Sequence, residues 1–177
     1  EPVTGLSPEQ MTAISNSLIF DFGIYGGYEY TGSSWTLIPA PDPDRMIAWN
    51  FLMVFDLGIY GIYTFDGLSW NFLAGIDAEA MAAWGTSAVF DLGIYGVYAY
   101  DGTTWTPITA GNPEGIAGWG PYVVADFGAY GIYAYDGAVW SSLSGTNPEA
   151  MTEWGKYLVA DFGPLGVYRY DGSTWTE

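Results

Sequence analysis

A 35-residue pattern repeats along the whole chain and constrains its fold more than any other feature. An aspartate opens an Asp-[Phe/Leu]-Gly step in each repeat, at Asp21, Asp56, Asp91, Asp126 and Asp161. Five copies without an insertion indicate one structural unit written five times, and they use all but two of the 177 residues. We therefore predict a single domain, 1–177, with repeats at about 7–41, 42–76, 77–111, 112–146 and 147–177 plus 1–6.

Each repeat contains short apolar runs that are separated by Gly, Pro, Asn and Asp. The runs are β-branched or aromatic and are too short for helices. In the last repeat we predict strands over 150–154, 157–162, 167–170 and from 174 onward. Asp171-Gly172 suits a tight hairpin before the fourth strand, and the Gly-x-x-Gly step suits a hairpin between the second and third. Each repeat is predicted to be a four-stranded antiparallel meander.

Stacking of the repeats is required because a single sheet of this size cannot bury both of its faces. A closed ring of twisted sheets provides that stacking without long free edges. We therefore predict an all-β fold, a five-bladed β-propeller in which each blade is a four-stranded meander of 35 residues. An open solenoid would need polar capping repeats, and the end repeats here are almost as apolar as the middle ones. Residues 1–4 would continue the outer strand of the last blade as a minor latch.

The segment from Val167 to Thr176 has the sequence Val-Tyr-Arg-Tyr-Asp-Gly-Ser-Thr-Trp-Thr, and related strings occur in every repeat. It resembles the blades of bacterial β-propellers of the two-component-regulator type. This resemblance implies a propeller that serves as a sensing or binding scaffold. By blade number alone the chain is similar to five-bladed lectins of the tachylectin-2 type, which is an analogy at the level of the fold.

Composition excludes several classes of function. Twenty acidic residues against three basic ones give a net charge of −17, which leaves no basic patch for nucleic acid or anionic membranes. No apolar run approaches the roughly 18 residues of a membrane span, so membrane insertion is not expected. The chain has no cysteine and no histidine, which removes disulfides and the commonest general base. We expect no catalytic residues, and an extracellular or cell-surface location. Because Glu1-Pro2-Val3 begins no signal peptide, we also expect a mature or excised chain.

Aromatic residues recur at fixed repeat positions. The nine tryptophans occupy two of these positions, namely Trp35, Trp70, Trp105, Trp140 and Trp175, and Trp49, Trp84, Trp119 and Trp154. Large rings at such regular places are expected to fill the wedges between twisted sheets as core. The first repeat has Ile14 where the others have tryptophan, so its wedge should be less filled. The tyrosines of the third strand share one face and are also expected in the core.

The five repeated aspartates are the sharpest chemical feature of the sequence. Carboxylates related by a fivefold axis would suit a cation such as calcium, or a sugar hydroxyl. Alternatively, each aspartate accepts hydrogen bonds from the amides of its own Gly-x-x-Gly hairpin, as short acidic side chains do in turns. We favour the turn role and expect no cofactor other than calcium.

The tips of the hairpins between the second and third strands are the better candidates for a binding site. Their second residues are Tyr25, Tyr60, Tyr95 and Tyr130, with Pro164-Leu165 in the last repeat. In a meander these tips share a rim with the connections between repeats, which carry Asp44, Glu79, Glu114 and Glu149. An aromatic plate beside acidic acceptors suits a sugar. The alternative for the acidic motifs is a capped turn, in which Asn or Asp caps and Pro follows.

These features predict a non-catalytic, multivalent binding module with up to five equivalent sites between blades. A glycan or a cell-surface polymer is the expected ligand, because weak equivalent sites gain through avidity on a repetitive surface. The alternative is a structural or protein-interaction propeller, as part of a larger surface protein or as a self-associating assembly unit. Pro164 and Leu165 replace the tyrosine pattern, so the fifth site should be the weakest.

Overall fold

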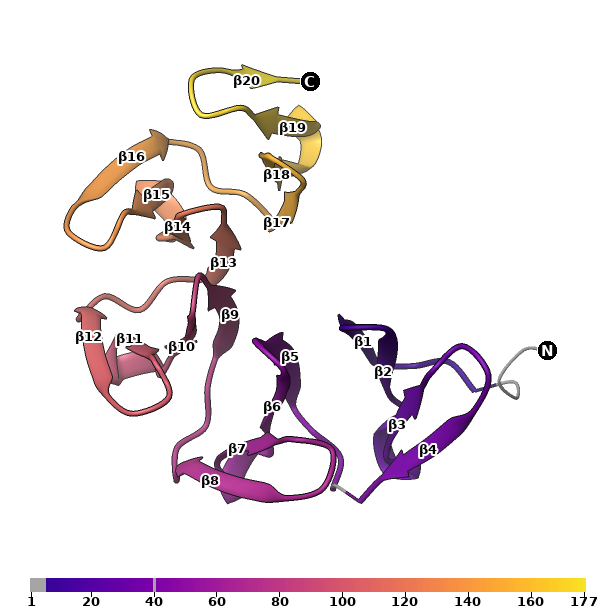
Figure 1. Cartoon of the computed structure of the whole chain (residues 1–177). Coiled ribbons are helices and arrows are strands. Elements are labelled where there is room, and N and C mark those ends of the chain that lie inside the picture. The colour runs from indigo at the N-terminus through magenta and orange to yellow at the C-terminus, as the bar shows by residue number, and fades with distance from the viewer. Residues whose placement is uncertain (1–5, 40) are drawn as a thin grey trace. The chain divides into compact units, whose positions relative to one another are not determined.

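The chain folds into five four-stranded antiparallel sheets, the blades of a β-propeller (Figure 1). The computed structural model describes residues 6–39 and 41–177. The predicted all-β fold is confirmed, and the predicted latch formed by residues 1–4 lies outside the described residues. Two compact units, Glu1–Ala78 and Glu79–Glu177, divide the chain. Among the described residues, no helix is long and apolar enough to cross a membrane.

The first unit contains blades 1 and 2. Blade 1 comprises β1 (Gln10–Ile14), β2 (Ser17–Asp21), β3 (Gly27–Tyr30) and β4 (Trp35–Ile38). Blade 2 comprises β5 (Arg45–Trp49), β6 (Leu52–Asp56), β7 (Ile62–Phe65) and β8 (Trp70–Ala74). Strands adjacent in the sequence are adjacent in each sheet, so both blades are simple meanders.

The second unit contains blades 3 to 5. Blade 3 comprises β9 (Ala80–Trp84), β10 (Ser87–Asp91), β11 (Val97–Tyr100) and β12 (Trp105–Thr109). Blade 4 comprises β13 (Gly115–Trp119), β14 (Tyr122–Asp126), β15 (Ile132–Tyr135) and β16 (Trp140–Ser144). Blade 5 comprises β17 (Ala150–Trp154), β18 (Tyr157–Asp161), β19 (Val167–Tyr170) and β20 (Trp175–Thr176). The strands predicted for the last repeat are therefore found within one residue of their predicted ends.

The second strand of a blade is its most buried element. Four of the five residues are buried in each of β6, β10 and β14, and Phe55, Phe90 and Val123 have no exposed surface. In β14, Val123 packs with residues of blade 3 and Val124 with residues of blade 5, so both faces of the strand are covered, which explains why it is an unbroken apolar run rather than an alternating one. The aspartate of each repeat ends this strand and pairs with the first residue of the first strand, as Asp91 pairs with Ala80. Each carboxylate therefore lies at one rim of its blade.

The tryptophans are less uniformly buried than the sequence predicts. Trp119 is buried, and its Nε1 donates a hydrogen bond to the Lys156 carbonyl in the following blade at 3.0 Å. Trp84 reaches the Pro121 carbonyl at 2.7 Å in the same way. The prediction of a core position is wrong for Trp154, whose side chain is 62% exposed. The Trp154 ring lies beside Tyr157 of its own blade, with the ring centroids 5.9 Å apart.

The expected gap beside Ile14 is present between blades 1 and 2. A pocket of about 170 Å³ is lined by Ile14, Phe51 and Met53, among others. We expect Ile14→Trp to fill this pocket and to stabilise the protein by about 1 to 2 kcal/mol, because buried apolar area increases. The new indole would also reach the Phe51 carbonyl, which stands at the position equivalent to Pro121.

Urea denaturation of the parent, Ile14→Trp and Ile14→Leu would check this prediction. The leucine variant conserves volume and should change the free energy of unfolding by less than about 1 kcal/mol. A tryptophan variant no more stable than the parent would contradict the prediction.

Candidate functional site

Each hairpin between the second and third strands ends in one turn of 3-10 helix rather than a two-residue loop. These turns are η1 (Gly23–Tyr25), η2 (Gly58–Tyr60), η3 (Gly93–Tyr95), η4 (Gly128–Tyr130) and η5 (Gly163–Leu165). Both glycines of a turn have positive φ, as in Gly128 (60°) and Gly131 (83°), a conformation that side chains disfavour. The Gly131 amide donates to the Gly128 carbonyl at 2.8 Å and closes the turn. The Gly-x-x-Gly spacing therefore fixes the direction of the two residues at the tip.

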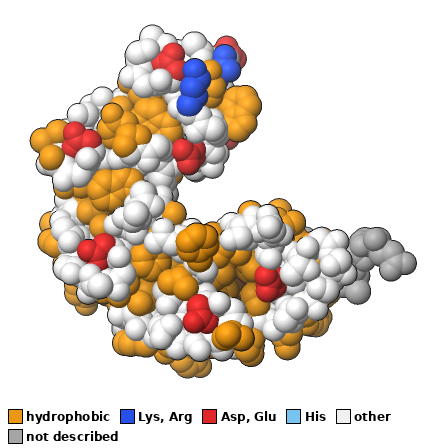
Figure 2. Space-filling view, in the orientation of Figure 1, with side chains coloured by type: hydrophobic (Ala, Val, Ile, Leu, Met, Phe, Trp, Pro, Cys, Tyr) orange, Lys and Arg blue, Asp and Glu red, His pale blue; other side chains and the backbone are white. Residues whose placement is uncertain are grey.

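The apolar residues at the tips face solvent, as the sequence predicts. The tyrosines are 58 to 78% exposed, and the isoleucines that precede three of them are 85 to 91% exposed. Exposed apolar side chains at one repeated position are unusual enough to indicate a contact surface. Figure 2 shows single acidic side chains among hydrophobic ones on one face of the molecule, with the visible basic side chains on the last blade.

The repeated aspartates lie at the base of these tips, where four are buried and Asp161 is half-buried. Asp21, Asp56 and Asp91 have no exposed surface. In each blade, Oδ1 accepts the N–H of the first tip glycine at 2.8 to 3.1 Å. These are the hydrogen bonds from hairpin amides that the sequence favoured for the repeated aspartates. They use only one of the two oxygens of each carboxylate.

Burial changes the protonation of these aspartates. Desolvation is the largest cause of a raised pKa for Asp21, Asp56 and Asp126. It raises the pKa of Asp56 to about 7, with a further contribution from neighbouring Asp77, and the pKa of Asp126 to about 6. Arg45 lies 3.7 Å from Asp56 Oδ2, but its half-exposed side chain does not outweigh burial. Asp56 and Asp126 therefore have pKa values well above the usual range for aspartate, and the pKa of Asp21 is raised in the same direction.

A second acid lies over the first glycine of every tip. Its backbone N–H donates to the carbonyl of the repeated aspartate at 2.7 to 2.9 Å. A Cβ built on Gly128 would overlap the carboxylate of Glu114, and the other four tips show the same close approach. The predicted acidic residues Asp44, Glu79, Glu114 and Glu149 are thus held at the bases of the tips. A side chain at this position would have to displace the carboxylate, and the positive φ of the glycine also disfavours one.

A third polar residue approaches these two acids from the loop that follows the blade. It is an acid in two cases and an amide in two, which gives four groups among the described residues. They are Glu9, Asp21 and Asp42; Asp44, Asp56 and Asp77; Glu79, Asp91 and Asn112; and Glu114, Asp126 and Asn147. The sequence offers these third members as acceptors beside the tips or as caps of a turn, and their approach to the acids of the preceding blade is decided by stacking.

Aromatic and acidic side chains line separate depressions in the second unit. A groove of about 310 Å³ is lined by Tyr130 together with Thr109, Phe127, Tyr133 and Trp140. The centroid of the Phe127 ring lies 5.9 Å from that of Tyr133 and 5.6 Å from that of Trp140, and both pairs are arranged edge to face. A smaller pocket of about 80 Å³ is lined by Glu114, Asp126 and Glu149. Tyr130 and Glu114, which the sequence predicts in one site, therefore line different depressions.

The sequence did not identify the rest of the aromatic groove. Tyr133 and Trp140 were expected only to fill core, and no role was predicted for Phe127, but all three are partly accessible at the groove. One signal was present, because a phenylalanine follows the repeated aspartate in some blades while leucine follows it in others.

No protein-family model matches the chain, and no match was found among curated protein sequences. Solved structures do match. The chain is similar to YCF48 bound to D1 peptide (TM-score 0.70, 15% identity, 96% of this chain and 65% of that one). It is also similar to virginiamycin B lyase from Staphylococcus aureus (TM-score 0.66, 12% identity, 96% of this chain and 67% of that one).

A third similar structure is PorZ, described as an essential bacterial surface component of the type-IX secretion system of Porphyromonas gingivalis. The TM-score is 0.61 with 15% identity, over 98% of this chain and 28% of that one. The chain thus spans from about a quarter to about two thirds of the length of these structures. At such low identity the likeness supports the propeller fold alone.

Proposed function

We propose that this chain is a non-catalytic, multivalent binding module that contacts its ligand through the rim of exposed tips, and that the ligand is a glycan. The observation that carries the proposal is the aromatic groove beside Tyr130, a tip residue that is 78% exposed. Its rings present flat apolar faces on which the C–H faces of a sugar stack. Thr109 at the groove edge adds a hydroxyl for hydrogen bonding.

The repetition of the tips supports multivalency. Four blades carry a tyrosine at the equivalent tip position, and each is exposed. Linked weak sites bind a repetitive polymer far more tightly than any one of them alone. A glycan at the surface of a cell is such a repetitive polymer, and the proposal therefore includes a location outside the cell or at its surface.

Binding to arrayed glycans and to insoluble polysaccharides would test the proposal. We expect Tyr130→Ser to weaken binding about tenfold at the groove of blade 4, because stacking of a sugar on one ring contributes about 1 to 2 kcal/mol. Phe51→Ser is the matched control, because Phe51 is an equally exposed ring in a turn between the first two strands of a blade, at the opposite rim. A failure of the parent protein to retain any glycan would refute the proposal.

A protein partner is the second candidate, and the exposed isoleucines favour it. Ile24, Ile59 and Ile94 are the most exposed residues of their tips, and an aliphatic side chain adds little to sugar stacking. The similar structure of YCF48 contains a bound peptide. Ile94→Ser separates the candidates, since it should leave glycan binding unchanged but weaken a protein contact or self-association, measured by light scattering at increasing concentration.

A further inference from the structure

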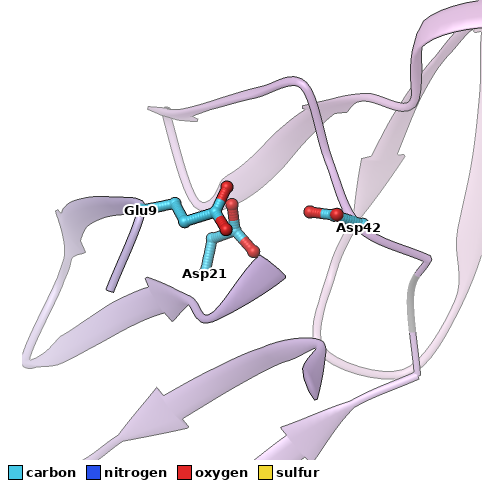
Figure 3. Close-up of side chains that lie close together, drawn as sticks. All are labelled: Glu9, Asp21 and Asp42. Atoms are coloured by element: carbon cyan, nitrogen blue, oxygen red, sulfur yellow. The ribbon is translucent and has the colours of Figure 1, made fainter. Parts of the chain in front are cut away.

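We propose that Glu9, Asp21 and Asp42 bind one Ca²⁺ ion at the contact between blades 1 and 2. This proposal is independent of the tyrosine tips and differs from a ring of five equivalent aspartates. One carboxylate oxygen from each residue lies within 4.8 Å of the other two. Figure 3 shows Asp42 directing its carboxylate from its loop toward those of Glu9 and Asp21.

The equivalent groups in the second unit show how the repeat normally balances its paired acids. At Asn147 the side-chain amide donates to Glu114 Oε2 at 3.2 Å. The Asn112 amide, in the orientation that satisfies both its nitrogen and its oxygen, donates to Glu79 Oε2 at 3.2 Å and Asp91 Oδ1 at 3.3 Å. An amide donor therefore occupies the space between blades in both cases. Asp42 stands at the same repeat position and supplies a third negative charge instead.

The group around Asp56 also has an aspartate at this position but has other partners. Asp56 Oδ2 accepts the N–H of Ala78 at 3.1 Å and lies 3.7 Å from Arg45. It also shares a hydrogen bond with the side chain of Asp77. The Ala78 N–H and Arg45 therefore partly offset the charge of this carboxylate, whereas Asp77 raises its pKa.

Asp21 lacks the donors that serve Asp56. The position of Ala78 is taken by Pro43, which has no N–H to donate, and that of Arg45 by neutral Gln10, whose amide makes the smallest contribution to the pKa of Asp21. Asp21 has no exposed surface, and its Oδ2 has no hydrogen-bond partner among the described residues. A buried carboxylate oxygen without a donor is costly, and a cation would supply the missing positive charge.

The loop that carries Asp42 is held in place by Gln10. The Gln10 amide donates to the carbonyls of Pro43 (3.2 Å) and Asp44 (2.9 Å), and its oxygen accepts the Met46 N–H at 3.2 Å. The Gln10 side chain is thus occupied by the loop backbone. These bonds fix Asp42 opposite Glu9 and Asp21, so the three ligands are arranged before an ion binds.

Calcium suits this group better than the other common divalent ions. Ca²⁺ takes oxygen ligands at about 2.3 to 2.6 Å in flexible geometry, so two of its ligands can lie up to about 5 Å apart. Mg²⁺ requires about 2.0 to 2.1 Å in a strict octahedron. Glu9 and Asp42 are exposed, which leaves one side open for the waters that complete the coordination. The absence of histidine and cysteine disfavours zinc and copper.

Calcium titration of the chelator-treated full chain tests the proposal, with calorimetry and thermal unfolding as readouts. We expect one ion per chain, a Kd between about 10 µM and 1 mM, and a melting temperature that rises with Ca²⁺ and less with Mg²⁺. Asp42→Asn gives this group the residue found at Asn112 and Asn147. It should fold normally, bind Ca²⁺ at least about tenfold more weakly, and melt in chelator no lower than the parent.

The reciprocal variant Asn147→Asp should bind one additional ion with Glu114 and Asp126. The proposal fails if the parent shows no saturable binding up to about 5 mM Ca²⁺, above the range of weak extracellular sites. Equal affinity in Asp42→Asn would also overturn it. The proposal is also overturned if Ca²⁺ has no effect while lowering the pH stabilises the parent more than Asp42→Asn. A proton shared between the carboxylates would then take the place proposed for the ion.

Discussion

Replacement of Gly131 by alanine is expected to destabilise the protein by about 3 to 5 kcal/mol, a large effect for a single methyl group. Gly131 has φ 83° and ψ −158°, a region of backbone conformation that is almost restricted to glycine. A Cβ there would overlap the backbone carbonyl of Ser144 and lie 2.7 Å from the Cα of Gly145. A backbone atom cannot move aside as a flexible side chain can, so strain and overlap act together.

Urea denaturation followed by tryptophan fluorescence measures this effect. Gly145→Ala is the matched control, because its φ is not positive and a Cβ there would meet nothing within 4 Å. It should change the free energy of unfolding by less than about 0.5 kcal/mol. A decrease of less than about 1 kcal/mol in the free energy of unfolding of Gly131→Ala would contradict the prediction. It would mean that residue 131 does not have positive φ in the η4 turn.

The second large effect is a loss of stability as the pH rises from about 4.5 to 8. Asp56 and Asp126 have pKa values raised from 3.8 to about 7 and about 6, chiefly by burial. Between the unfolded and folded pKa values the folded chain binds more protons, so the free energy of unfolding falls with rising pH. At about 1.4 kcal/mol per pKa unit, the two groups together imply a loss of about 3 to 6 kcal/mol.

Stability should also fall at the acid end, so that the maximum lies near pH 4 to 5. Backbone amides lower the pKa of the exposed hairpin aspartates, and that of Asp171 falls to about 2. Contributions of groups with lowered pKa values are lost as the pH falls through those values. On the alkaline side, repulsion between the negative charges of a chain of net charge −17 also lowers the free energy of unfolding, as the ionisation of Asp56 does.

Denaturation at several pH values in chelator and constant salt would check this profile. Asp126→Asn keeps an oxygen for the Gly128 N–H and places an amide near Glu114. This variant should match the parent near pH 5 and exceed its stability near pH 8. A parent protein whose stability rises steadily from pH 5 to pH 8 would show that these carboxylates are not the dominant titrating groups.

Local features of the sequence determined the blade. The 35-residue period, the Asp-Gly hairpins and the Gly-x-x-Gly tips predicted four strands per repeat and the exposure of the tyrosines. The hydrogen bond from the Gly23 N–H to Asp21 was also predictable, because short acidic side chains in turns commonly accept a hydrogen bond from the backbone N–H two residues later. Each of these features depends on neighbours within a few residues, which a single sequence shows directly.

Contacts between blades were decided only by the tertiary structure. Stacking brings Asp42 to Glu9 and Asp21 from the next repeat, and in the packed structure Tyr130 and Glu114 line different depressions. Periodicity shows that Asp42 and Asn147 are equivalent in the repeat, but not what each one faces. The charge of the buried aspartate is offset only where a donor reaches it, as the Ala78 N–H reaches Asp56. Pro43 stands at the equivalent position beside Asp21 and has no N–H, and such contacts form only once adjacent sheets are packed.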